Sequence, residues 1–172
     1  EISTEAAGEL SHWWRCLRAV QPEVPRSVHL ARLDSWFAGR KGDKEFDAAL
    51  KLARAWTPPP PITAGQWRVA MAAACERVGR LEEAEEILKD DPSWLADFLF
   101  RQKRWAEAAK AFARSPEADA ANYLQGVALI RAGDEARGRP LLLRGRLIPL
   151  ADEAARYGLA ARLQRLGLHE EA

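Results

Sequence analysis

Gly-Arg-Leu-Glu-Glu-Ala, at residues 79–84, is the stretch of sequence that decides the fold of this chain. Its glycine follows a helical run and can take the left-handed conformation that ends a helix, and the residues after it begin a second helix. Two further stretches have the same form: Lys-Arg-Trp-Ala-Glu-Ala at residues 103–108 and Gly-Leu-His-Glu-Glu-Ala at residues 167–172. The chain is therefore predicted to contain repeated pairs of helices joined by short turns.

Five such turns can be aligned along the chain. Their anchor residues are Gly42, Gly79, Lys103, Gly133 and Gly167, at spacings of 37, 24, 30 and 34 residues. Seven residues before the anchors stand small side chains, where two helices can approach closely: Ser35, Ala72, Ala96, Gly126 and Ala160. Five residues after the anchors stand Asp47, Ala84, Ala108, Gly138 and Ala172, of which four are small. Repeats of this length, with two helices each, indicate stacked hairpins that bury their apolar faces against their neighbours.

Helical periodicity runs through the whole chain, which is rich in alanine and arginine and poor in β-branched residues. One apolar stripe is formed by Trp67, Met71, Ala74, Cys75 and Val78, and a second by Trp105, Ala108, Ala109 and Phe112. Helix starts are predicted where Asp91 precedes Pro92 and where Ser115 precedes Pro116. These patterns predict an all-α protein.

At the turns and the openings of the second helices, the sequence resembles the tetratricopeptide repeat family. The resemblance covers roughly residues 64–172, and it implies a right-handed superhelical array of antiparallel helix hairpins, an α-solenoid. Some features depart from the family pattern: units of 24 and 30 residues, Lys103 at a turn position, Asp47 where the family prefers alanine, and Pro140 inside a second helix. We therefore expect degenerate repeats with irregular curvature.

Four consecutive prolines follow Thr57 and predict a stiff connector over residues 57–62. It separates N-terminal helices at residues 1–56, which contain degenerate repeat units, from tetratricopeptide-like repeats at residues 63–172. The last repeat stops where a second helix should begin, so the array is expected to continue beyond the chain given.

An arginine stands two residues before every anchor: Arg40, Arg77, Arg101, Arg131 and Arg165. A cation in the last turn of a helix is favoured by the exposed carbonyls and the helix dipole, which is one explanation of this pattern. A second is that the first helices line a concave face, as in the family resembled, where the arginines form a ladder for carboxylates or phosphates. A third is ion pairing with another domain. On the second explanation, the partner-binding residues are Arg77, Arg101, Arg131, Arg165, Phe100, Tyr123 and Tyr157.

Other classes of function find little support in the sequence. The 26 Lys and Arg residues against 25 Asp and Glu give a net charge of +1, so no nucleic-acid partner is expected. No apolar run reaches the roughly 20 residues that a membrane span requires. The three histidines and two cysteines lie too far apart in sequence to indicate a metal site, and no catalytic motif is present, so we expect no metal, no cofactor and no independent enzyme.

The function expected is that of a scaffold that binds a partner protein or peptide on its concave face, with acidic groups as the best match to the arginines. The alternative is an accessory superhelical domain of a larger enzyme, for example a cell-wall lytic enzyme, whose catalytic domain lies outside this chain. Self-association is a further option. The compartment stays open, with the cytoplasm favoured over the periplasm, and the alanine and arginine bias favours a bacterial source.

Overall fold

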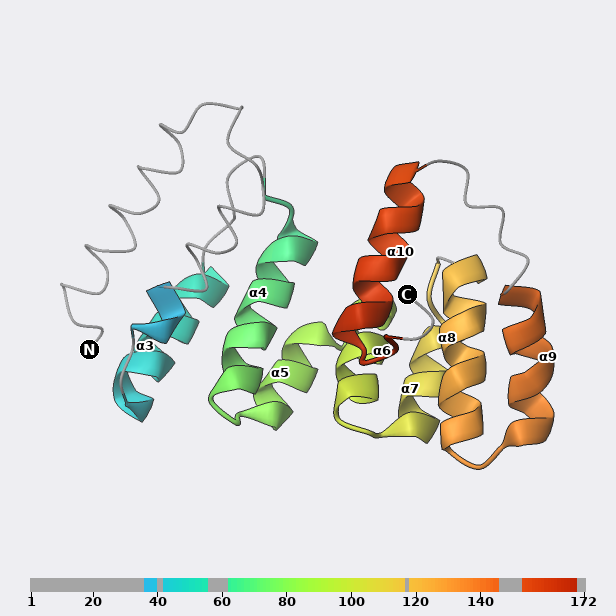
Figure 1. Ribbon diagram of the computed structural model, residues 1–172. Coiled ribbons are helices and arrows are strands. Elements are labelled where there is room, and N and C mark those ends of the chain that lie inside the picture. The colour runs from blue at the N-terminus through green and yellow to red at the C-terminus, as the bar shows by residue number, and fades with distance from the viewer. Residues whose placement is uncertain (1–35, 40–41, 56–61, 117, 146–152, 170–172) are drawn as a thin grey trace. The chain divides into compact units, whose positions relative to one another are not determined.

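The computed structural model describes residues 36–39, 42–55, 62–116, 118–145 and 153–169. All regular structure in these residues is helical, which confirms the all-α class for them (Figure 1). The helices are α3 (Asp43–Ala55), α4 (Ala64–Arg77), α5 (Leu81–Leu88), α6 (Pro92–Arg101), α7 (Trp105–Phe112), α8 (Ala118–Arg131), α9 (Glu135–Gly145) and α10 (Glu153–Arg165). A short helical stretch also covers residues 36–38. None of the helices in the described ranges is long and apolar enough to cross a membrane.

The chain divides into two compact units, Glu1–Leu88 and Lys89–Ala172. The first contains α3, α4 and α5, and the second contains α6 to α10. The division lies between α5 and α6, whereas the predicted proline-rich connector lies inside the first unit and, apart from Ile62, outside the described residues. The helices predicted before residue 36 and the copy of the turn motif that ends at Ala172 also lie partly or wholly outside them.

In the first unit, the apolar stripe predicted on α4 is buried over most of its length. Trp67, Met71, Ala74 and Cys75 are each at most 4% exposed. Val78, predicted to continue the stripe, is 49% exposed. The prediction is wrong there because α4 ends one residue earlier and the chain turns away from the core.

Helix α4 is fixed at its N-terminus and against α3 by side-chain hydrogen bonds. Thr63 and Gln66 form a capping box, in which Thr63 Oγ1 accepts from the Gln66 amide (3.2 Å) and Gln66 Oε1 accepts from the Thr63 amide (3.0 Å). Farther along, Trp67 Nε1 donates a buried hydrogen bond of 2.8 Å to the carbonyl oxygen of Ala53 on α3. The capping box satisfies two helix-end amides, and the indole bond sets the position of α4 on α3.

Four of the five turns have the same backbone geometry, that of the Schellman motif. At the first of them, the Gly79 amide donates to the Glu76 carbonyl (3.1 Å) and the Arg80 amide donates to the Cys75 carbonyl (2.9 Å). Equivalent pairs of bonds close the turns at Lys103, Gly133 and Gly167. In the part of the chain that the structure describes, the residues with positive φ are the five aligned anchors, Gly42 and Lys103 included.

A pair of oppositely charged side chains follows three of the turns, one and four residues after the anchor. The pairs are Arg80–Glu83 (2.8 Å), Arg104–Glu107 (2.5 Å) and Asp134–Arg137 (3.2 Å). In the first two pairs the arginine comes first, whereas in the third the acidic residue comes first. The hairpins therefore repeat a side-chain arrangement as well as a backbone turn.

Asp47 departs from the small residue that the repeat pattern prefers, and its contacts give the reason. Its carboxylate lies 2.5 Å from the guanidinium of Arg80, which stands in the turn after α4. The same guanidinium lies 5.1 Å from the ring centroid of Phe46. Arg80 thus links α3 to the α4–α5 hairpin, and the position after the Gly42 turn serves an ion pair instead of a close helix contact.

In the second unit, small residues let neighbouring helices approach closely, as the repeat pattern predicts. Figure 1 shows α6 beside α7, α7 beside α8, and α8 beside α9. Gly126 on α8 faces α9 so closely that a Cβ on it would lie 2.8 Å from the backbone nitrogen of Leu142. Helix α9 continues through Pro140. The equivalent alanines of the other hairpins are also buried: Ala72, Ala84, Ala96 and Ala108.

Of the two predicted helix starts, one is confirmed and one is wrong. Helix α6 begins at Pro92 with Asp91 at its N-cap, although the carboxylate makes no capping hydrogen bond. Ser115 does not cap α8, which begins at Ala118. Its hydroxyl instead lies 2.6 Å from that of Ser93, and so joins the ends of α7 and α6.

Candidate partner-binding site

The arginines that precede the turns are the last residues of helices. Arg77, Arg101, Arg131 and Arg165 end α4, α6, α8 and α10, and all four side chains are exposed. Arg40 lies outside the described residues. A helix end of this kind favours a cation by about 0.3–1 kcal/mol, whatever else the side chain does. A shared binding function requires, in addition, that some of these guanidinium groups come together.

Arg131 is placed against aromatic rings of its own unit. Its guanidinium lies 5.2 Å from the ring centroid of Phe100 and 5.0 Å from that of Trp105. Phe100 is only 1% exposed and packs edge-on against Trp105 and Phe112. The expectation that Phe100 offers its ring to a partner is therefore wrong, because this ring belongs to the core between α6 and α7.

The two tyrosines differ in exposure. Tyr123 on α8 is half-buried and takes part in an interaction within the chain. Tyr157 on α10 is 69% exposed. Tyr157 is thus the ring among the predicted aromatic anchors that is most open to a partner.

Asp97 on α6 is the one buried charged residue in the part of the chain that the structure describes, at 3% exposure. The guanidinium of Arg162 on α10 binds its carboxylate with three hydrogen bonds. Arg162 Nε donates to Oδ2 (2.9 Å) and Oδ1 (3.1 Å), and a terminal nitrogen donates to Oδ1 (2.9 Å). The Arg162 side chain is itself 11% exposed. The two residues lie 65 positions apart in the sequence, so no local pattern predicts their pairing.

Two of the arginines in the predicted ladder lie near this ion pair. Burial raises the pKa of the Asp97 carboxyl, and Arg162, Arg101 and Arg165 oppose that rise because each favours the charged form. Arg101 follows Asp97 by one helical turn on α6, and Arg165 follows Arg162 by one turn on α10. We call these four residues the Asp97 cluster. It holds three guanidinium groups and one carboxylate.

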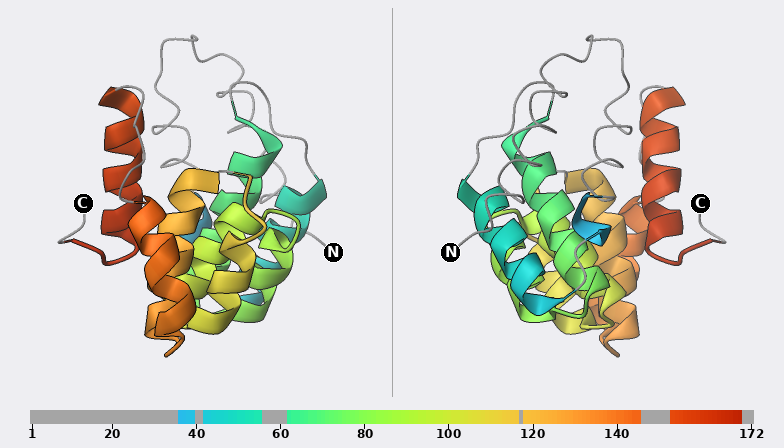
Figure 2. Two further views of the ribbon diagram at one scale, coloured as in Figure 1. Left: turned by 90° about the vertical axis from the view of Figure 1, so that its right-hand side faces the viewer. Right: turned by 90° about the vertical axis from the view of Figure 1, so that its left-hand side faces the viewer.

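The position of α10 departs from a simple stack of hairpins. In such a stack each hairpin contacts its neighbours, so α10 would follow α9. Instead, the C-terminal end of α10 lies against α6, where Arg162 binds Asp97 (Figure 1), and Figure 2 shows α10 to one side of the other helices of its unit. The Asp97–Arg162 bond agrees with this arrangement.

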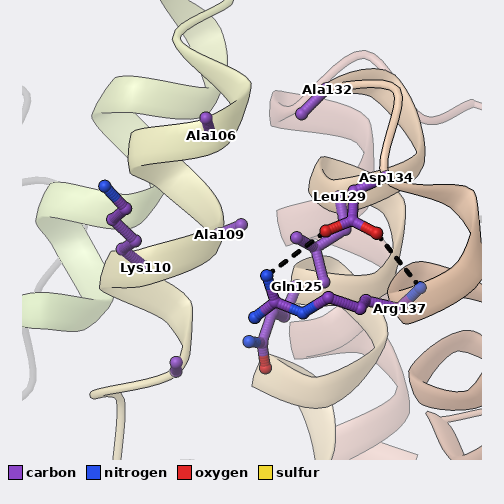
Figure 3. Close-up of a pocket in the computed structure, with 9 residues that line it drawn as sticks. Ala106, Ala109, Lys110, Gln125, Leu129, Ala132, Asp134 and Arg137 are labelled. Atoms are coloured by element: carbon purple, nitrogen blue, oxygen red, sulfur yellow. Dashed lines mark hydrogen bonds and ion pairs between the residues drawn. The ribbon is translucent and has the colours of Figure 1, made fainter.

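A cavity of about 290 Å³ lies between α7, α8 and the start of α9 (Figure 3). Its lining residues are Ala106, Ala109, Lys110, Ala113, Gln125, Leu129, Ala132, Asp134 and Arg137. The polar members include the Asp134–Arg137 pair, which already bind each other. The volume is at the lower end of the range for small-molecule sites, and no residue of the Asp97 cluster lines it. Among the residues described, no group of three or more His, Cys, Asp or Glu is placed to hold a metal ion.

No protein-family model, curated protein or solved structure matches this chain. The resemblance to tetratricopeptide repeats therefore rests on the sequence alone. The candidate site is the Asp97 cluster, in which Arg101 and Arg165 of the predicted ladder both act electrostatically on Asp97, whereas Arg131 packs on Phe100 and Arg77 belongs to the first unit.

Proposed function

We propose that this chain is a scaffold that binds an acidic segment of a partner protein, and that its hairpins form a right-handed superhelical array of the tetratricopeptide-like kind. Three repeated features support the array: the Schellman turns, the small residues between paired helices, and the ion pairs that follow the turns. Stacked hairpins of this type offer an extended surface, which suits a segment of another protein.

The Asp97 cluster is the observation that carries the binding proposal. Arg162 holds its carboxylate, and Arg101 and Arg165 add two exposed guanidinium side chains to the cluster. Guanidinium groups bind carboxylates with two parallel hydrogen bonds, which favours an acidic segment. Tyr157, exposed on the same helix as Arg165, supplies an apolar contact for such a segment.

The proposal is tested with a fluorescein-labelled hexaglutamate peptide, whose binding is followed by fluorescence anisotropy at low salt. We expect the full chain to bind it, and the double variant Arg101→Gln with Arg165→Gln to bind at least tenfold more weakly. Glutamine removes the charge but keeps a good helix former at each position. Binding should also weaken as salt is added, because exposed charges are screened.

A charge-matched control separates a local site from a general effect of charge. The variant Arg114→Gln with Arg139→Gln removes two positive charges from exposed positions outside the cluster. It should bind the peptide within about twofold of the unmodified chain. Equal losses in the two double variants, or no binding by the unmodified chain, would contradict the proposal, provided that circular dichroism shows the same helical content in all three proteins.

A further inference from the structure

The candidate site is assembled from two helices that lie far apart in the sequence. Asp97 and Arg101 belong to α6, whereas Arg162 and Arg165 belong to α10. Helices α7, α8 and α9 lie between them in the chain. The three arginines can therefore act together only when α10 is docked against α6.

The Asp97–Arg162 ion pair is well suited to fix how α10 docks. Leu163 on α10 and Leu166 just after its end are 4% and 6% exposed, so apolar packing also holds this part of the chain. Apolar packing has no direction, but three hydrogen bonds to one carboxylate select a single rotation of the helix about its axis. Residues three apart lie on the same face of a helix, so the rotation that directs Arg162 to Asp97 also directs Arg165 toward α6.

We propose that Asp97 is a positioning residue, which docks α10 through Arg162 and thereby places Arg165 beside Arg101 to complete the anion-binding site. This inference rests on the proposed function. It adds that partner binding and the docking of α10 stabilise each other, because two linked equilibria must act reciprocally. On this proposal, the anion-binding site exists only while α10 is docked on α6.

The variant Asp97→Asn distinguishes positioning from simple electrostatics. It removes one negative charge from the cluster, so an electrostatic effect alone predicts tighter binding of the hexaglutamate peptide. Loss of the docked α10 predicts the opposite, and we expect the affinity to fall at least fivefold. The matched control is Asp134→Asn, which removes one negative charge from an exposed ion pair in the same unit and should not weaken binding.

Hydrogen–deuterium exchange supplies a readout that does not depend on the peptide. In Asp97→Asn, the amides of α10 should exchange at least tenfold faster than in the unmodified chain, while those of α6 and α7 keep their rates. The milder variant Arg162→Lys keeps the positive charge but loses the planar guanidinium that binds both carboxylate oxygens. Its loss of peptide affinity and its rise in α10 exchange should lie between those of the unmodified chain and Asp97→Asn.

The two assays keep the inference and the proposed function apart. If α10 stays protected in Asp97→Asn, or if it becomes exposed without any loss of peptide binding, the inference is wrong. If the unmodified chain does not bind the peptide, the proposed function fails. In that case, the rate of amide hydrogen exchange in α10 of Asp97→Asn, compared with the unmodified chain, still tests whether Asp97 docks this helix.

Discussion

Gly138 on α9 faces Gly126 on α8 so closely that a Cβ on Gly138 would lie 2.7 Å from the carbonyl oxygen of Gly126. It would also lie 2.6 Å from Cγ1 of Ile130. Real Cβ atoms essentially never approach their neighbours this closely. The two glycines therefore set a separation of α8 and α9 that no larger residue allows.

Gly138→Ala should lower the free energy of unfolding by up to about 2 kcal/mol. The added methyl group must displace backbone atoms, at a cost of about 1–3 kcal/mol, which outweighs a gain of about 1 kcal/mol in helix propensity. Gly158→Ala on α10 is the control, because nothing lies within 4 Å of its Cβ position. Urea unfolding should show the control stabilised by about 0.5–1 kcal/mol. A stabilised Gly138→Ala would mean that α8 and α9 can separate at little cost.

Lys103→Gly should stabilise the protein by about 0.5–1 kcal/mol. Lys103 has φ of 60°, a left-handed conformation that costs a residue with a side chain about 1–2 kcal/mol. Part of this gain is offset by the greater chain entropy of glycine in the unfolded state. The reverse change is Gly79→Ala. Gly79 has φ of 81°, and nothing lies within 4 Å of its Cβ position, so the alanine should lower the free energy of unfolding by about 1 kcal/mol through backbone strain alone. A lower melting temperature for Lys103→Gly would show that the lysine side chain contributes more than its backbone conformation costs.

The thiol of Cys75 should react only when the protein opens. Cys75 is fully buried, and burial is the main cause that raises the pKa of its thiol to about 11. At pH 8 about one thiol in a thousand is ionised. The raised pKa also means that this thiol stabilises the fold below its ordinary pKa of about 8.5, and that this stabilisation is lost as the pH rises through 11.

A thiol reagent measures this in a Cys16→Ser variant, which leaves Cys75 as the single cysteine. Labelling at pH 8 should be slow and should accelerate with urea in step with unfolding. Complete labelling of the native protein within seconds would show that α4 opens locally.

The effect of Asp97 on stability should depend on pH in a defined direction. Burial raises the pKa of the folded carboxyl above its unfolded value, so the fold favours the protonated form. The part of the Asp97 contribution that arises from this pKa shift is then fully present below the unfolded pKa of about 3.9, and that part is lost as the pH rises through the folded pKa. The asparagine of Asp97→Asn has no ionisable side chain, so this variant lacks the pH-dependent contribution of residue 97. The difference in unfolding free energy, wild type minus variant, should therefore fall between pH 3 and pH 7 in urea titrations. A difference that grows with pH would mean that the three arginines outweigh the burial.

The turns could be predicted from the sequence because they depend on local backbone chemistry. Alignment of the glycines placed Lys103 among the turn anchors, and the structure gives it the same positive φ. The small residues that flank the turns at Gly79, Lys103 and Gly133 were also identified correctly, since a close helix contact requires them, as at Ala84 and Ala108. These features are determined by a few neighbouring residues, so one sequence suffices to find them.

The site could not be predicted in the same way. The bond between Asp97 and Arg162 depends on where α10 docks, and no local pattern records that position. Phe100 was assigned to the partner-binding face because the alignment of the repeats places the first helices on the concave face, whereas the structure buries its ring with Ala96, Phe98 and Leu99. Which face of α6 is covered depends on tertiary packing, here the edge-on contacts of Phe100 with Trp105 and Phe112.

The span of 65 residues between Asp97 and Arg162 has a consequence for how the second unit folds. Hairpins close short loops, whereas a bond across this span must overcome a larger loss of chain entropy and forms more slowly. We therefore expect α6–α7 and α8–α9 to form first and α10 to join last, once its acceptor on α6 is in place. A stack with neighbour contacts alone frays from its ends, but here the last helix is bonded to the first helix of the unit. That closure should make the unit unfold as one cooperative block.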